Sequence, residues 1–298
     1  MAITTATSAR SYVVRAGSQA LRLDSRPLIM GILNVTPDSF SDGGSYVTVE
    51  QALRHAKQMH DEGADIIDIG AESSRPGAQS IVDSEELRRL MPVLEAVHAA
   101  VPLPISVDTT KAVVARRAIQ AGATIINDIS ALRGDPLMAT VAAETGAAVV
   151  LMHMQGTPQT MQKSPKYQNV VQEVSAFLCE RAQTAIQQGI SRTQIILDPG
   201  FGFGKLQEHN LRLLASLDLL TDLGFPILVG LSRKQFIGAL VQQSVQERGY
   251  GTAGAVAVAV LKGAHIIRVH DVRSMRDTAL VVSAIGRHAR SGIEESHA

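Results

Sequence analysis

Short apolar runs recur along the chain, and polar residues stand where most of these runs end. Six runs follow a glycine that closes an amphipathic stretch, namely Gly63, Gly122, Gly146, Gly189, Gly224 and Gly263. Glycine is favoured just after a helix because the left-handed backbone costs it little. The runs are continuously apolar rather than alternating, which is typical of parallel strands covered on both faces. The pattern predicts helices that alternate with buried strands.

Two further runs, LIMGILN and LPISVD, bring the predicted strands to eight. We expect strands near residues 28–34, 65–69, 104–108, 124–128, 147–153, 195–198, 226–230 and 265–269. We expect helices near residues 49–62, 84–100, 111–121, 136–145, 168–188, 208–223, 252–262 and 274–290. Eight strand–helix units indicate an α/β fold, the closed (β/α)8 or TIM barrel, whose chemistry lies at the C-terminal ends of the strands.

The whole pattern fits a single barrel domain over residues 12–290. We expect a disordered extension at 1–11 and a disordered tail at 291–298. The segment VVRAGSQALRLDS, with a tight turn at Gly17-Ser18, predicts a short hairpin that caps the floor of the barrel. The Arg- and Ser-rich start of the chain leaves open a weaker alternative, an organelle transit peptide.

Charge and cysteine content limit the classes of function that the chain can have. The chain carries 28 Lys and Arg against 28 Asp and Glu, so no net field favours nucleic acid or an anionic membrane. No apolar run is long enough to span a bilayer. Cys179 is the one cysteine and has no partner within the chain, which favours a reducing compartment. We therefore expect a cytoplasmic protein that binds neither membrane nor nucleic acid.

The polar residues at the strand ends are the candidates for chemistry. Asp108, Asn127 and Asp198 end three strands, and Lys234 follows a fourth. Two carboxylates, an amide and an ammonium can match the donors and acceptors along the edge of a polar heterocycle. The sequence has no evident Ser–His–Asp arrangement and no His, Cys and acid cluster at metal-ligand spacing. The site is therefore expected to hold and polarise a ligand.

A second group of residues is suited to binding an anion. Arg268 and His270 end the eighth strand, the region where many barrels bind phosphate, and Arg75 lies in the long loop after the second. Arginine favours phosphate because its planar fork can donate two hydrogen bonds to it.

Each candidate also has a plainer interpretation. Asp108 could cap the helix that begins near Lys111, and Asp198, before Pro-Gly, could be an ordinary turn residue. Lys234 could be a solvated surface lysine. His153, between two methionines, is expected to be a packed histidine rather than a ligand. These residues share one face of the predicted barrel, which favours a site.

Motifs across the barrel resemble those of the dihydropteroate synthase family of pterin-binding barrels. They are MGILNVTPDSFSDGG (30–44), DIIDIGAESSRPGA (65–78), PISVDTTK (104–111), GATIINDI (122–129), VVLMHMQGTP (149–158), ILDPGFGFGK (196–205), LVGLSRK (228–234) and IIRVHDV (266–272). The resemblance implies a transferase of folate biosynthesis and a sulfonamide target. Its reaction joins 6-hydroxymethyl-7,8-dihydropterin diphosphate to p-aminobenzoate, giving 7,8-dihydropteroate and pyrophosphate. A homodimer is also implied.

The resemblance also implies roles for individual residues. Asn34 would contact the cofactor Mg²⁺, which also binds the diphosphate. The remaining roles fall into three groups: Asp108, Asn127, Met152, Asp198 and Lys234 at the dihydropterin; Arg75, Arg268 and His270 at the diphosphate; Ser73, Ser74, Pro76, Phe203 and Gln235 at the p-aminobenzoate. Asp108, Lys234, Arg268 and His270 would be catalytic.

Two positions depart from the family pattern. Ser74 replaces the usual threonine, and Gln235 replaces a serine that helps to bind the acceptor carboxylate. These departures leave open a non-catalytic paralogue that binds pterin. A pterin-family methyltransferase is another alternative, although such an enzyme has no use for the NVTPDSFSDGG loop.

Overall fold

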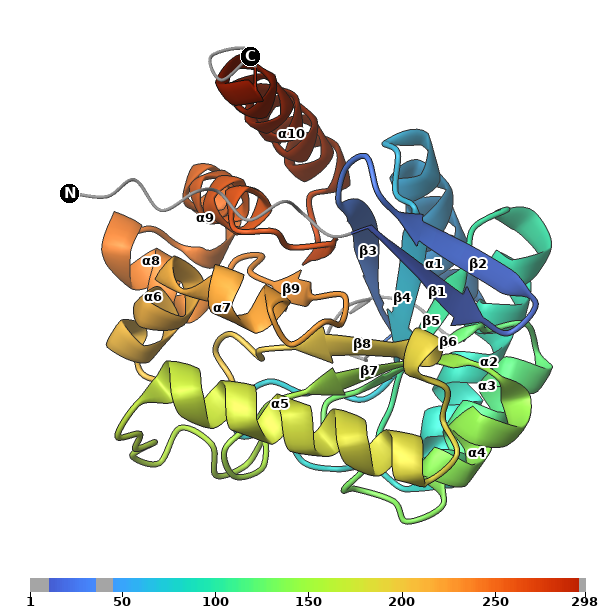
Figure 1. Ribbon diagram of the computed structural model, residues 1–298. Helices are drawn as coiled ribbons and strands as arrows, with labels where there is room; N and C mark the ends of the chain where they lie inside the picture. Colours follow the sequence, from blue (N-terminus) through green and yellow to red (C-terminus); the bar gives the residue numbers. More distant parts are fainter. Residues whose placement is uncertain (1–10, 36–44, 295–298) are drawn as a thin grey trace.

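The computed structural model describes residues 11–35 and 45–294, which form a barrel of parallel strands surrounded by helices (Figure 1). The strands are β1 (Tyr12–Ala16), β2 (Gln19–Leu23), β3 (Leu28–Asn34), β4 (Ile66–Gly70), β5 (Ile105–Asp108), β6 (Ile125–Asp128), β7 (Ala148–Met152), β8 (Ile195–Asp198), β9 (Leu228–Gly230) and β10 (Ile266–Val269). The helices are α1 (Ser45–Asp61), α2 (Asp83–Ala100), α3 (Ala112–Gln120), α4 (Met138–Thr145), α5 (Val170–Gln187), α6 (Gln207–Ala215), α7 (Leu217–Thr221), α8 (Gln235–Val241), α9 (Gly249–Leu261) and α10 (Val272–Glu294). Two 3-10 turns, Arg192–Gln194 and Val245–Glu247, precede β8 and α9.

Eight strands pair in the order β8-β7-β6-β5-β4-β3-β10-β9, all parallel. The ring closes between β8 and β9, where Leu197 bridges Ile227 and its N–H donates to Pro226 O at 2.9 Å. The six glycines after helices have φ between +69° and +109°, as the sequence pattern predicts. The (β/α)8 barrel is therefore confirmed, with each expected strand within two residues of its observed bounds.

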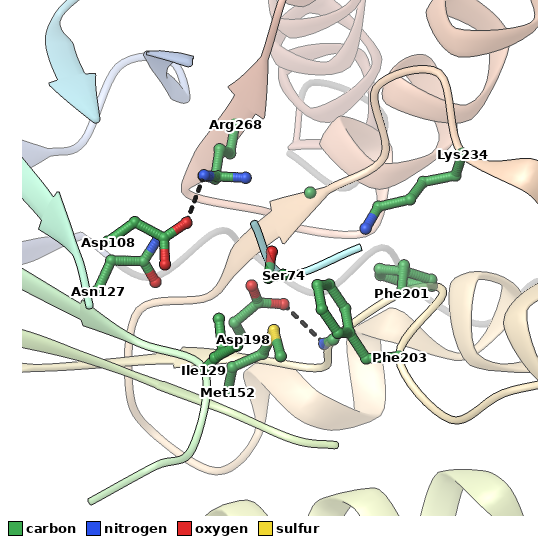
Figure 2. Close-up of a pocket in the computed structure, with 12 residues that line it drawn as sticks. Ser74, Asp108, Asn127, Ile129, Met152, Asp198, Phe201, Phe203, Lys234 and Arg268 are labelled. Atoms are coloured by element: carbon green, nitrogen blue, oxygen red, sulfur yellow. Dashed lines mark hydrogen bonds and ion pairs between the residues drawn. The ribbon is translucent and has the colours of Figure 1, made fainter. Parts of the chain in front are cut away.

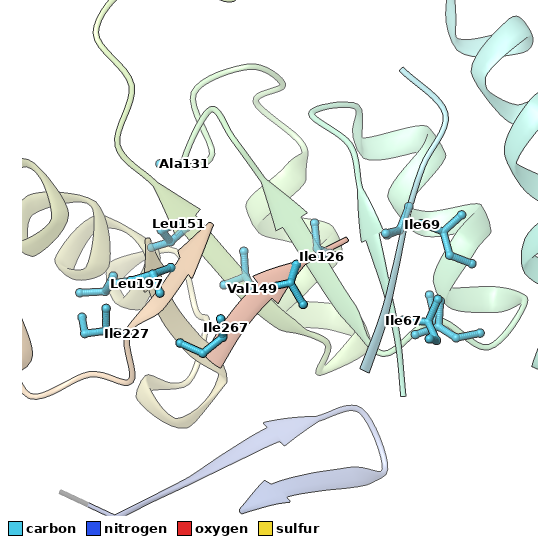
Figure 3. Packing of buried hydrophobic residues seen from close by; sticks show 14 of the residues in the cluster. Ile67, Ile69, Ile126, Ala131, Val149, Leu151, Leu197, Ile227 and Ile267 are labelled. Carbon is cyan, nitrogen blue, oxygen red and sulfur yellow. The ribbon is translucent and has the colours of Figure 1, made fainter. Parts of the chain in front are cut away.

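Alternate residues of the strands face the two sides of the barrel wall. One set packs outward against the helices; Ile67, Ile126, Val149, Leu197 and Ile267 are examples (Figure 3). The other set faces the interior, and its lower members form a separate apolar cluster of Met30, Ile66, Ile125, Ala148, Val150, Ile196, Leu228 and Ile266. Both faces of each strand are buried, which explains the continuously apolar runs.

The hairpin β1–β2 covers the floor of the barrel, as expected (Figures 1 and 3). Its buried residues Val14, Ala16, Leu21 and Leu23 belong to the same cluster as the lower interior side chains. Gly17 N also donates to Gly146 O at 2.9 Å, which ties the turn of the hairpin to the end of α4. The hairpin leaves the opposite end of the barrel open.

The helices differ from expectation at several places, and α1 begins at Ser45, four residues before its expected start. The helix expected near 208–223 is divided into α6 and α7, and α8 after Lys234 was not predicted because it has only seven residues. α10 continues to Glu294, beyond the expected domain end at residue 290. Residues 1–10 and 295–298, for which disorder was expected, lie outside the described residues. So does most of the NVTPDSFSDGG loop. Within the described ranges, no helix is long and apolar enough to cross a membrane.

Candidate active site

A pocket lies at the C-terminal end of the barrel, above the apolar layer of the interior. Its lining residues come from the strand ends and the loops that follow them (Figure 2): Ser74, Asp108, Asn127, Ile129, Met152, Asp198, Gly200, Phe201, Phe203, Gly230, Lys234 and Arg268. Eight of the expected site residues thus meet in one place, although they span almost 200 positions of the sequence.

The strand register explains how the pocket forms. Asn34 pairs with Gly70, Gly70 with Asp108, and Asp108 with Asn127, so these residues stand at one level around the barrel. A Cβ atom on Gly70 would lie 3.3 Å from Asp108 Cβ, tighter than ordinary contact. Glycine at this position therefore leaves room for the Asp108 side chain. Asn34 lies two strands from Asp108 at this level.

Arg268 on β10 forms ion pairs with two aspartates on the neighbouring strands β4 and β5. Its Nε donates to Asp68 Oδ2 at 2.6 Å, and one terminal nitrogen donates to Asp108 Oδ2 at 2.8 Å. Asn127 Nδ2 donates to the same Asp68 oxygen at 3.2 Å. In the sequence Asp68 is a polar residue inside an apolar run, and nothing in that run identifies its partners. Its contacts depend on strands that are distant in the sequence.

Burial changes the pKa of several pocket groups. It raises the pKa of Asp108 to about 7, because desolvation and the nearby carboxylates of Asp68 and Glu86 outweigh the attraction of Arg268. Desolvation and the charge of Arg268 lower the pKa of Lys234 to about 8, with partial compensation from Asp198. Burial also raises the pKa of Asp198. Such displaced values are common at functional sites.

Arg268 itself stays cationic. Burial lowers the pKa of its guanidinium, but Asp68 and Asp108 more than compensate and leave it raised.

The loop after β8 forms one wall of the pocket. Asp198 Oδ1 accepts a hydrogen bond from Gly200 N at 2.7 Å, so this aspartate stabilises the turn and also lines the pocket (Figure 2). Phe203 follows in the same loop, and Lys234 Nζ lies 4.3 Å from the centre of its ring. The turn interpretation of Asp198 is thus compatible with a role in the site. Lys234 is not a solvated surface lysine.

The structure also decides whether Asp108 caps a helix and whether His153 is a packed residue. Asp108 does not cap α3, because the first amide of that helix, Ala112 N, donates to Asp135 Oδ2 at 2.9 Å. His153 is a packed residue, as expected: its ring meets Phe177 edge-on at 4.9 Å and its Nδ1 lies 2.9 Å from Lys205 Nζ. Lys205, which ends the DPGFGFGK motif, had no role in the sequence-based expectations.

The remaining expected residues do not line the pocket. His270 Nδ1 lies 3.0 Å from Ser232 Oγ, two positions beyond Arg268. Arg75, Pro76 and Gln235 are exposed, and Ser73 Oγ accepts a hydrogen bond from Arg75 N at 3.4 Å. The described conformation does not bring Arg75 to Arg268.

Burial lowers the pKa of His270 to about 4, with further contributions from the charges of Arg268 and Arg233. At neutral pH this histidine is therefore a neutral hydrogen-bonding group rather than a cation.

No cluster of three or more His, Cys, Asp or Glu side chains suited to a metal ion occurs within residues 11–35 and 45–294. A metal at this site would need other oxygen ligands, such as an amide, the substrate or water.

Comparison with known proteins agrees with this geometry. The model of the pterin binding enzyme family matches residues 30–270. Dihydropteroate synthase of Escherichia coli K12 is 48% identical over 268 residues, covering 90% of this chain and 95% of the relative. That of Bacillus subtilis is 44% identical over 276 residues, covering 93% and 94%.

Solved structures give the same result. Xanthomonas albilineans dihydropteroate synthase with 4-aminobenzoic acid superposes with a TM-score of 0.87 at 46% identity, covering 93% of this chain and 98% of that one. The same enzyme in complex with 7,8-dihydropteroate gives a TM-score of 0.83 at 44% identity, covering 92% and 98%. Fold, pocket and sequence thus point in one direction, and the chain belongs to the pterin-binding enzyme family.

Proposed function

We propose that this chain is a dihydropteroate synthase, a transferase of folate biosynthesis. It joins 6-hydroxymethyl-7,8-dihydropterin diphosphate to p-aminobenzoate and releases 7,8-dihydropteroate and pyrophosphate. The observation that carries the proposal is the meeting of Asp108, Asn127, Asp198, Lys234 and Arg268 around one pocket. Relatives that share 44–48% of their residues with nearly the whole chain bear this enzyme's name.

One edge of the pterin ring carries hydrogen-bond donors and acceptors, and the polar groups of this pocket can pair with them. Asp108 and Asp198 offer carboxylate acceptors, and Lys234 offers donors. The amide of Asn127 gives its NH2 to Asp68, so its carbonyl oxygen is left for the ligand. Met152 and Phe203 supply apolar surface for the ring faces. This mixture of few polar groups and apolar walls is typical of small-molecule pockets.

The diphosphate would extend from the ring toward the end of β10. Arg268 uses Nε and one terminal nitrogen for Asp68 and Asp108, which leaves its other terminal nitrogen for a phosphate oxygen. His270, neutral at pH 7, would donate a hydrogen bond rather than a charge. Arg75 would have to move from its exposed position to join them.

Asn34 fits a magnesium ion that arrives with the diphosphate. It is a half-buried amide at the pocket end of β3. Mg²⁺ takes few protein ligands, keeps waters and accepts phosphate oxygens, so a single amide oxygen is a suitable contribution. Bound there, the ion would neutralise part of the charge on the diphosphate.

The reaction breaks the bond between the pterin methylene carbon and the diphosphate oxygen, and its electron pair leaves with pyrophosphate. Arg268 and His270 would stabilise the negative charge that develops on the leaving group. Asp108 and Asp198 would stabilise the electron-poor pterin. The p-aminobenzoate nitrogen then forms the new bond to the methylene carbon and loses a proton. The amine is a neutral nucleophile at pH 7 and needs no strong base.

The acceptor would bind between Phe203 and the loop after β4. Ser74 lines the pocket on this side, and Ser73 and Pro76 lie beside it in the loop. Gln235 is exposed at the first position of α8, where backbone N–H groups have no partner within the helix, so its N–H would bind the acceptor carboxylate. Closure of the loop would exclude water from the cationic pterin.

We further propose a cytoplasmic homodimer. α9 and α10 pack against each other and carry exposed apolar residues on their outer surfaces, namely Tyr250, Val258, Leu261, Val281 and Ile285. A second copy would cover this apolar surface. Sedimentation equilibrium should give twice the chain mass of 31.7 kDa, whereas a monomer at micromolar concentration would contradict this assignment.

One assay tests the function. The purified chain is incubated with both substrates and Mg²⁺, and pyrophosphate and dihydropteroate are measured. We expect equal amounts of the two products, and a loss of turnover at low pterin concentration in Lys234→Ala. Pterin binding without products would indicate a non-catalytic paralogue. Absence of both binding and products would refute the proposal.

A further inference from the structure

One carboxylate lies inside the barrel between the apolar floor and the pocket. Asp68 is 0% exposed. Its Oδ2 accepts hydrogen bonds from Arg268 Nε and Asn127 Nδ2, at 2.6 and 3.2 Å. Its Oδ1 has no hydrogen-bond partner in the described part of the chain. Asp68 therefore contacts two pocket residues from different strands while staying beneath the pocket itself.

This arrangement is costly for stability. Two carboxylates, Asp68 and Asp108, share the single guanidinium of Arg268. Ser106, the register neighbour of Asp68 on β5, also has a buried oxygen without a partner among the described residues. Buried polar groups are nearly always hydrogen-bonded, and an apolar replacement of a buried ion pair is often neutral or stabilising. Stability alone does not explain a carboxylate at this position.

The contacts of Asp68 do determine what the pocket offers. With Nε held by Asp68 and a terminal nitrogen held by Asp108, the plane of the Arg268 guanidinium is fixed. The bond from Asn127 Nδ2 to Asp68 turns the amide so that its carbonyl oxygen, an acceptor, is available to a ligand. A flipped amide would offer donors instead.

We propose that Asp68 is a positioning residue of the pterin site, which sets the plane of Arg268 and the orientation of the Asn127 amide. The inference rests on the proposed function, because it takes the pterin as the ligand. In the described part of the chain the hydrogen bonds of Asp68 go to Arg268 and Asn127, both proposed to lie on the donor side of the site, so its effect should fall on the pterin and not on p-aminobenzoate.

The charge of Asp68 has a separate effect, on Asp108. The charged groups that act on Asp108 are Arg268 from β10, Asp68 from β4, Glu86 from α2, Asp128 from β6 and Lys234 before α8. Neutralising Asp68 removes one repulsive carboxylate and leaves Arg268 to Asp108 alone. Both changes favour the ionised form of Asp108, so its pKa should fall.

Two substitutions separate geometry from charge. Asp68→Ala removes both hydrogen bonds, and we expect the affinity for 6-hydroxymethyl-7,8-dihydropterin, measured by calorimetry without diphosphate, to fall at least tenfold. The KM for p-aminobenzoate should stay within twofold. Asp68→Asn keeps an acceptor oxygen for Arg268 and Asn127, and its NH2 can donate to Ser106. We expect its pterin affinity within threefold of the parent chain.

The pH profile provides a readout that a purely structural role would not change. In Asp68→Asn the acid limb of kcat/KM for the pterin substrate should move at least half a pH unit lower. The matched control is Asp65→Asn, directly before β4 at the floor, where Asp65 accepts hydrogen bonds from Arg26 at 2.7 and 2.8 Å. It should lower the melting temperature and leave pterin affinity and pH profile unchanged.

The outcomes are distinct. Unchanged pterin affinity in a folded Asp68→Ala would overturn the proposal. Where Asp68→Ala does not fold, a loss of pterin affinity beyond threefold in Asp68→Asn, which keeps an acceptor oxygen for both contacts, would overturn it. An unmoved acid limb in Asp68→Asn would overturn the effect of Asp68 on Asp108. Failure of the parent chain to bind pterin would instead remove the proposed function, together with this inference.

Discussion

Single side chains in the pocket titrate close to neutral pH. Burial holds the pKa of Asp108 at about 7 and, with the charge of Arg268, that of Lys234 at about 8. The two residues line the same pocket, and their proposed roles at the pterin require opposite charges. Small changes of pH therefore change the charge pattern that the substrate meets.

The pH dependence of kcat/KM for the pterin substrate should be a narrow bell. The rate constant rises as Asp108 ionises, through about pH 7, and falls as Lys234 loses its proton, through about pH 8. Initial rates at low pterin concentration across pH 5–10 give the profile. Lys234→Arg, which stays charged, should lose the alkaline limb. An alkaline limb that persists at the same pH in this variant would exclude Lys234 as its source.

Asn34→Ala tests the proposed magnesium contact. We expect the Mg²⁺ concentration for half-maximal rate to rise about tenfold, because a charge-linked oxygen contact is worth about 1.5 kcal/mol or more. Affinity for the pterin without diphosphate should not change. The measurement is a magnesium titration of the initial rate. An unchanged magnesium requirement would remove Asn34 from this role.

At the scale of elements, the conformation of the loop after β8 depends on hydrogen bonds from a buried lysine. Lys205 is 3% exposed, and its Nζ lies 2.9 Å from His153 Nδ1 and donates to the carbonyls of Gly200 and Phe203 at 2.8 and 3.1 Å. These bonds join the end of β7 to the loop that carries Phe203. A Cβ atom on Gly200, whose φ is +67°, would collide with His153 O, so the loop approaches β7 very closely.

Lys205→Met should loosen this loop. Several buried acceptors would lose their donor, at a cost of about 3 kcal/mol. Because Phe203 moves with the loop, the KM for p-aminobenzoate should rise about tenfold. The matched control is Lys262→Met, which removes a half-exposed pair with Asp218 at 3.2 Å and should cost less than about 1 kcal/mol. Equal effects of the two substitutions on KM would contradict the proposed role of Lys205.

The sequence was sufficient for the elements and for most pocket residues. Glycines after helices and apolar runs mark the eight strands, and strand ends mark the barrel mouth, so Asp108, Asn127 and Asp198 could be placed without coordinates. Asp68 and Lys205 could not be given roles, because their partners come from distant strands and loops. The exposed position of Arg75 was equally beyond reach, since sequence alone does not fix the conformation of a long loop.

At the scale of the whole molecule, the barrel separates stability from chemistry. The lower interior and the hairpin form an apolar cluster at the floor, while the charged groups gather at the mouth. The apolar packing at the floor therefore stabilises the fold and leaves the mouth free for binding groups that are costly to bury.

Two substitutions in the hairpin test whether the floor contributes to stability without affecting binding at the mouth. Val14 is 1% exposed and packs on the floor, whereas its neighbour Val13 is 52% exposed. Val14→Asp should lower the free energy of unfolding by about 3 kcal/mol or more, because it buries a carboxylate without a partner. Val13→Asp should change it by less than about 0.5 kcal/mol. Thermal unfolding measures both effects. Pterin affinity at 20 °C should be unchanged in both variants, and a loss in Val14→Asp would mean that floor and mouth are coupled.

A crystal structure of the chain with a bound pterin tests the central claim most directly. We predict that the ring lies in the pocket at the barrel mouth, with its polar edge hydrogen-bonded to Asp108, Asn127, Asp198 and Lys234. A pterin bound elsewhere, or one in this pocket that leaves those four side chains without contact, would contradict the account.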